Sequence, residues 1–135
     1  MSNIWWWISP YNNALTGLLK TNNCYIEDKT EILQYINIFP TIFTCIEKAV
    51  YKARELFDDT TELSLEMFFS PEDQDDYYPT LYIRQYNYEP FIMDKINEIC
   101  RDYESLLSKQ IKADWNGWFL TMTDYQLPKY SNEQK

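Results

Sequence analysis

The sequence contains no histidine, only two glycines, and no apolar run long enough to cross a bilayer. Without histidine the chain cannot form a Ser-His-Asp or Cys-His arrangement, or a zinc site of the usual kind. With so little glycine it has no glycine-rich loop to cradle a phosphate group. We therefore expect a non-enzymatic protein with no cofactor and no metal. A small enzyme that uses carboxylates and tyrosines is the catalytic alternative left open.

Cysteine is also scarce. The three cysteines, Cys24, Cys45 and Cys100, are odd in number and widely spaced. They form no C-x-x-C pair of the kind that binds zinc or carries redox chemistry. The amino-terminal apolar run, residues 4–8, lacks the length and the basic flank of a signal peptide. These features predict a reduced, cytoplasmic protein that does not enter a membrane.

Basic residues are outnumbered: 12 Lys and Arg stand against 21 Asp and Glu, which gives a net charge of −9. Residues 1–60 carry 5 basic and 7 acidic side chains, whereas residues 61–135 carry 7 and 14. An acidic chain repels phosphate, so we expect no direct binding of nucleic acid. The same charge would steer the chain towards a basic partner protein.

Three stretches alternate between two sets of side chains, as a β-strand does. They are residues 61–69, 79–86 and 117–123, and the acidic segment Ser70–Tyr78 connects the first two as a hairpin. Facing residues of the hairpin should have numbers that add up to about 150, since this pairs opposite charges and aromatic rings. That register places Glu66 opposite Arg84, and Phe68 opposite Tyr82.

Apolar residues recur every three or four positions in residues 41–57 and 90–112, which predicts two longer helices. Ile99 lies in the middle of the second apolar stripe and should be buried. Gly117 can supply a positive φ at the entry to the last strand. A strand–helix–strand unit is right-handed and makes its two strands parallel. The sequence therefore predicts an α+β fold: a three-stranded mixed sheet in the order 2-1-3, with both longer helices on one face.

The length of the chain predicts a single domain, residues 1–135. Residues 1–40 are expected to form short helices at an edge of the sheet or over its other face. Residues 41–125 form the αββαβ core, and residues 126–135 a flexible tail. The triplet Trp5–Trp7 would cap the core edge or anchor a partner.

Two features predict a surface that binds a partner protein. The outer face of the sheet carries aromatic rings where polar groups are usual, with Phe119 among them, since Trp118, Leu120 and Met122 are expected to face the core. This face is either covered by the amino-terminal segment or exposed as an aromatic patch with an acidic rim. The second feature is the acidic connection of the hairpin, which lacks the ligand spacing of a calcium loop and would otherwise be a solvated turn. The candidate partner-binding residues are Phe68, Tyr82, Arg84, Tyr86, Glu72, Asp73, Asp75 and Asp76.

These expectations favour a small acidic protein that binds, and thereby neutralises or regulates, another protein, with a homodimer left open. In size, acidity and lack of catalytic motifs the chain is similar to bacterial and phage immunity proteins and antitoxins as a class, although no motif carries this likeness. A DNA mimic that occupies the nucleic-acid channel of its target is the alternative. It would need its acids to be spaced like phosphates.

Overall fold

The computed structural model describes residues 10–73, 75–113 and 117–130. Its helices and strands, in chain order, are α1 (Tyr11–Thr21), β1 (Cys24–Ile26), α2 (Lys29–Ile38), α3 (Thr41–Leu56), β2 (Glu62–Phe69), β3 (Tyr77–Arg84), α4 (Ile92–Ala113) and β4 (Leu120–Met122). The α+β class and both longer helices are confirmed, each helix within two residues of its expected bounds. Trp5–Trp7 lie outside the described residues.

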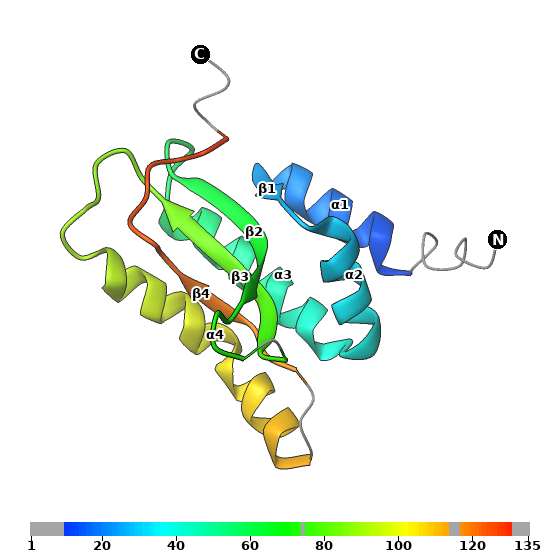
Figure 1. The fold of residues 1–135 in the computed structure, drawn as a ribbon. Helices are drawn as coiled ribbons and strands as arrows, with labels where there is room; N and C mark the ends of the chain where they lie inside the picture. Colours follow the sequence, from blue (N-terminus) through cyan, green and yellow to red (C-terminus); the bar gives the residue numbers. More distant parts are fainter. Residues whose placement is uncertain (1–9, 74, 114–116, 131–135) are drawn as a thin grey trace.

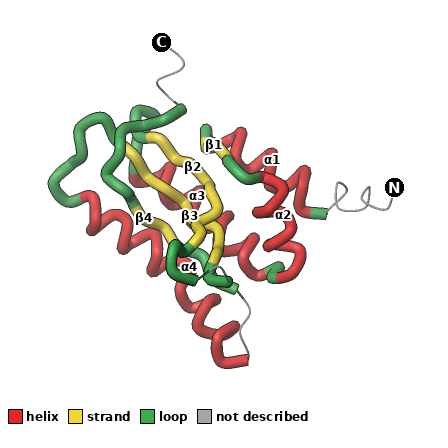
Figure 2. The backbone as a smooth tube through the Cα atoms, in the orientation of Figure 1, coloured by secondary structure: helices red, strands yellow, loops and turns green. Residues whose placement is uncertain are grey.

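The sheet has four strands in the order β1-β2-β3-β4, so the expected order of three strands is wrong (Figure 2). β2 and β3 are antiparallel, whereas β1 is parallel to β2 and β4 is parallel to β3. The strand that sequence reasoning missed is β1, whose three residues are too few to show alternation. Because β1 occupies the edge of β2, the last strand lies against β3 instead. Its direction, parallel to β3 after the connecting helix α4, is as expected, but its direct pairing with β3 is not.

The hairpin register differs from the expected one by four residues. Phe69 pairs with Tyr77 and Glu62 with Arg84, so the numbers of facing residues add up to 146. Sequence reasoning assigned Tyr77 and Tyr78 to the connection, but β3 already begins at Tyr77 and the connection is shorter. The error is an even number of residues, and each side chain of the hairpin therefore keeps its expected face. Glu66 instead faces Thr80, but the long side chain of Arg84 still reaches it, with 2.9 Å between Oε2 and Nη1.

One continuous core lies between the sheet and the helices α3 and α4. It contains the alternate residues of β2 and β3 that were expected to point inward, including Leu63, Leu65, Leu81 and Ile83. Ile99 of α4 is fully buried in it, as predicted. α1 packs against β1 and α3, and α2 contacts β2 and β3, so the short helices lie beside the β1 edge (Figure 1).

The facing of the last strand is opposite to the expected one. Phe119 is fully buried, with its ring 5.0 Å from that of Tyr103 on α4. The hydroxyls of Tyr103 and Thr121 are 3.1 Å apart, and this hydrogen bond lets a polar residue face the core. The hydrophobicity of the sequence alone could not reveal this pairing of Thr121 with Tyr103. Gly117, at the entry to this strand, has a φ of 100°, as expected.

The outer face of the sheet around Arg84 is covered by the chain that follows β4, whereas the described amino-terminal helices lie beside the β1 edge. Residues 124–130 cross from β4 past β3 and β2 towards β1 (Figure 1). Residues 126–130 of the expected flexible tail therefore lie along the sheet, while residues 131–135 lie outside the described part of the chain.

Candidate functional site

A buried ion cluster lies on the outer face of the sheet, around Arg84. This side chain is 1% exposed and is surrounded by three carboxylates, Glu62, Glu66 and Asp124. Its Nη2 and Nε donate to the two carboxylate oxygens of Asp124 at 3.0 and 3.1 Å. Burial alone would raise the pKa of Asp124, but the hydrogen bonds from Arg84 and from the backbone N–H of Gln126 outweigh it and hold that pKa below its usual value.

The same cluster fastens the carboxyl-terminal segment to the sheet. Glu62 accepts the backbone N–H groups of Lys129 at 3.1 Å and of Tyr130 at 2.7 Å. The ring of Tyr130 stacks on that of Tyr25 in β1, with 5.1 Å between centroids. Every charge of the cluster therefore has a structural partner, and Arg84 does not reach the surface where a partner could contact it.

The other predicted site residues are spread over three places. Phe68 and Tyr82 are half-buried on the outer face, Tyr82 under the guanidinium of Arg84 at 4.8 Å. Tyr86 is exposed in the loop after β3, at the opposite end of this strand from the hairpin connection. The connection holds the four acids, which are all exposed and are called the acidic tip below: Glu72, Asp73, Asp75 and Asp76. The structure thus does not assemble the eight residues into one surface.

A group of exposed apolar side chains that sequence reasoning missed lies beside the acidic tip. Ile38 is 66% exposed, Phe69 56% and Tyr77 42%, and we call these three residues the distal patch. Phe69 ends the strand before the tip and Tyr77 begins the strand after it, and their rings stack with 5.9 Å between centroids. Their odd numbers assign them to the helix side of the sheet, but α2 ends at Ile38 and leaves them uncovered. The available signal for this patch in the sequence was a pair of aromatic residues on either side of an acidic turn.

A pocket of about 250 Å³ opens at the distal patch. Tyr35 of α2 forms its buried wall and accepts a hydrogen bond from the N–H of Trp118, at 2.7 Å from the phenol oxygen. Burial raises the pKa of Tyr35 to about 12, and the nearby Tyr77 and Asp76 act in the same direction. This wall is therefore a neutral ring that is fixed in place and lies in the field of the acidic tip.

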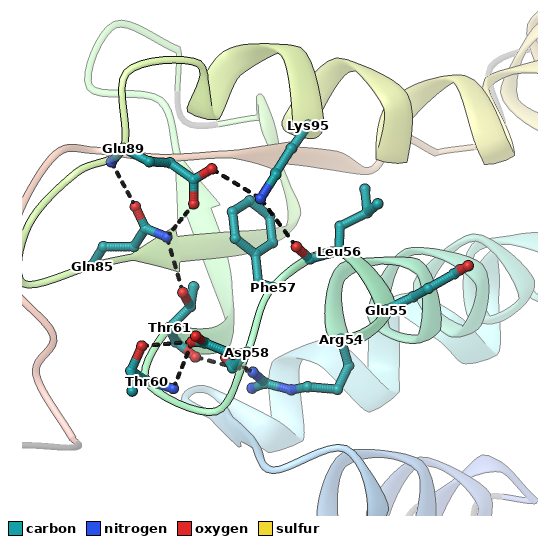
Figure 3. Close-up of a pocket in the computed structure, with 10 residues that line it drawn as sticks. All are labelled: Arg54, Glu55, Leu56, Phe57, Asp58, Thr60, Thr61, Gln85, Glu89 and Lys95. Carbon is teal, nitrogen blue, oxygen red and sulfur yellow. Dashed lines mark hydrogen bonds and ion pairs between the residues drawn. The ribbon is translucent and has the colours of Figure 1, made fainter.

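A larger cavity, of about 460 Å³, lies between the end of α3 and the start of α4 (Figure 3). The Nζ of Lys95 is 2.9 Å from Glu89 Oε1 and donates to the carbonyl of Leu56 at 3.2 Å. Arg54 donates to the carbonyls of Asp58 and Thr61, at 2.6 and 3.2 Å. The lining also holds three acids, Glu55, Asp58 and Glu89, against these two cations, so the cavity does not favour an anionic ligand.

The remaining chemistry of the described residues is limited. Burial raises the pKa of the Cys24 thiol to about 12 and that of Cys45 to about 11, which keeps both protonated and unreactive. Within residues 10–73, 75–113 and 117–130, no three His, Cys, Asp or Glu side chains are grouped so that they could hold a metal ion. No helix in that part of the chain has the length and apolarity needed to span a membrane.

No protein-family model, curated protein or solved structure matches the chain.

Proposed function

We propose that this chain is a small acidic binding protein that neutralises or regulates a basic partner protein, which it contacts through the distal patch and the acidic tip. The observation that carries the proposal is the exposure of Ile38, Phe69 and Tyr77 side by side at one end of the molecule. Isolated exposed apolar residues are common, but a contiguous group rimmed by polar residues is typical of a protein-binding surface.

The charges around the patch indicate the kind of partner. Glu31 lies beside it and the four acids of the tip follow Phe69 in the chain, within a molecule of net charge −9. Such a rim attracts a basic surface over a distance of about 10 Å, beyond which salt screens the charges, and raises the association rate. The rings of the distal patch, which become buried on binding, then hold the complex, since aromatic anchors dominate binding energy.

The immunity-protein and antitoxin class remains the best description of such a protein, and we place it in the cytoplasm. All three cysteines are free thiols, in keeping with a reducing compartment. A DNA mimic would act on the same kind of basic partner. It is distinguished by competition, since DNA would then displace the chain from its target.

Affinity capture from the native cell with two matched baits tests the proposal. One bait carries Phe69→Ala together with Tyr77→Ala, and the control carries Phe91→Ala, which removes a ring that is 72% exposed at a different site. We expect wild type and the control to retain the same basic protein and the patch variant to lose it. Equal retention by all three baits, or an acidic partner, would contradict the proposal. A captured second copy of this chain would instead make the patch a dimer interface.

A further inference from the structure

The pocket at the distal patch has the composition of a site for a cation. Three of its six lining residues are aromatic, namely Tyr35, Phe69 and Tyr77, and none of the six is basic. Ile38 and Gln34 complete the wall, and Glu31 contributes a carboxylate. Its volume of about 250 Å³ lies below the roughly 300–1,000 Å³ of pockets for small-molecule ligands, and suits a single side chain.

The rings are arranged so that a cation can contact more than one of them. Phe69 and Tyr77 are close to parallel, with an interplanar angle of 24°, and both line the pocket. Tyr35 meets Tyr77 edge-on, at 69° and 6.0 Å between centroids, and closes the pocket from the side of α2. The negative face of an aromatic ring attracts a cation that lies within about 6 Å of its centroid.

The electrostatics of the pocket favour a positive occupant over a neutral or negative one. Glu31 is in the first turn of α2, and Asp76 is close enough to act on the phenol of Tyr35. Lys29, a basic residue of the same helix, donates to Thr16 of α1 at 3.1 Å and does not line the pocket. A purely apolar anchor would desolvate the Glu31 carboxylate without pairing it, and an anion would be repelled by it.

We propose that this pocket binds the guanidinium group of an arginine side chain presented by the partner. The planar guanidinium stacks on an aromatic face and can donate two hydrogen bonds to one carboxylate, whereas the compact ammonium of lysine does neither as well. Arginine then lies against the rings of Phe69 and Tyr77 and bonds to Glu31. The inference rests on the proposed function, because it names the anchor by which a basic partner is recognised.

The test uses the purified chain and a blocked amino acid, so that no partner is needed. N-acetyl-arginine amide is titrated against the protein while the ring signals of Phe69 and Tyr77 and the methyl signals of Ile38 are followed by NMR. N-acetyl-citrulline amide, which has the same shape without the charge, is the matched ligand. We expect arginine to shift these signals and to bind at least about fivefold more tightly than citrulline. Glu31→Gln should weaken arginine binding by a similar factor, whereas Glu72→Gln on the tip should not.

Equal binding of the two ligands, or shifts confined to other parts of the molecule, would overturn the inference. So would unchanged arginine binding in Glu31→Gln. The variants replace exposed side chains, and a thermal melt of each confirms that it is folded. If arginine fails here but the captured partner is still lost on Phe69→Ala with Tyr77→Ala, the proposed function stands and only the arginine anchor is wrong.

Discussion

Arg84→Met should be among the most destabilising single substitutions in this protein. The side chain is 1% exposed, and its guanidinium lies within 3.5 Å of Glu62 and closer still to Glu66 and Asp124. Methionine is similar in length and keeps the apolar contacts of the arginine stem. The substitution therefore isolates the loss of charge, which leaves three carboxylates gathered on a covered face of the sheet.

The magnitude follows from the cost of breaking a buried ion pair by removing one partner, about 3–5 kcal/mol. Small domains have a net stability of about 5–15 kcal/mol. If the wild type lies at the lower end of that range, a third or more of the variant molecules should be unfolded. If it is more stable, the variant should still fold, with a lower unfolding midpoint. Lys129, whose Nζ is 3.8 Å from Glu66, is about half exposed and compensates little.

The pH dependence gives the prediction a second readout. In the variant, Asp124 keeps the burial that raises its pKa and loses the Arg84 hydrogen bonds that lower it, so its folded-state pKa rises above the unfolded value, the folded state binds more protons and stability falls as pH rises. The wild type has the opposite slope, since the pKa of Asp124 is lowered in the folded state. That contribution is present above the unfolded value of about 4 and is lost as pH falls through the lower folded value.

Urea unfolding followed by circular dichroism, at about pH 7 and about pH 5, measures both effects. Arg101→Met, at an exposed position of α4, is the matched control and should lose less than about 0.5 kcal/mol. The deficit of Arg84→Met should shrink at the lower pH. A loss below about 1 kcal/mol at the higher pH, or a deficit that grows on acidification, would refute the reasoning.

Three further substitutions test the core and the fixed positions around it. Ile99→Asp loses burial worth about 1.5–3 kcal/mol and adds an unpaired buried charge, so circular dichroism should show that the expressed protein is largely unfolded. A melting temperature within a few degrees of wild type would mean that α4 is misplaced. Gly117→Ala should cost about 1–3 kcal/mol in urea unfolding, because its φ is 100° and a Cβ would lie 2.8 Å from Phe39. Its control, Gly17→Ala, is at a helical position with open space and should stabilise the protein by about 0.4–1 kcal/mol. Equal effects of the two substitutions would contradict this. Tyr35→Phe leaves the N–H of Trp118 without its acceptor and should cost about 1–3 kcal/mol; an unchanged unfolding midpoint would show that the 2.7 Å hydrogen bond contributes nothing.

Periodic patterns predicted much of the fold. The alternation of β2 and β3 assigned each side chain of the hairpin to the correct face, and the stripe of α4 located Ile99 in the core. The strand order required the three-residue strand β1, which is too short to carry a pattern. The register was underdetermined, because both sums, 146 and about 150, keep every side chain on its face and bring Glu66 near Arg84.

The candidate site was less predictable, for a different reason. Alternation assigns a side chain to a face but does not tell where the covering layer ends, so Phe69 was not recognised as exposed. The covering of the outer face could not be predicted from the sequence either. Glu62 in β2 accepts hydrogen bonds from the backbone of Lys129 and Tyr130. Because these bonds come from the backbone, the side chains of this segment do not indicate them, and its polar composition is that of a loose tail.

The central claim is that the distal end of the molecule binds a basic protein, and binding kinetics on the captured partner test it most directly. Two variants are compared at low and at high salt. The first is Phe69→Ala, and the second replaces the four acids of the tip by Asn or Gln, which changes the net charge from −9 to −5. Two controls match them: Phe91→Ala, and the same neutralisation of four exposed acids elsewhere, Glu47, Asp59, Asp94 and Glu104.

We expect Phe69→Ala to raise the dissociation rate about 30-fold, the equivalent of roughly 2 kcal/mol, with little change in association. The tip variant should associate more slowly and with a weaker salt dependence than its charge-matched control. Dissociation that is equally fast in Phe69→Ala and Phe91→Ala, together with equal association rates for the two neutralised variants, would contradict the account.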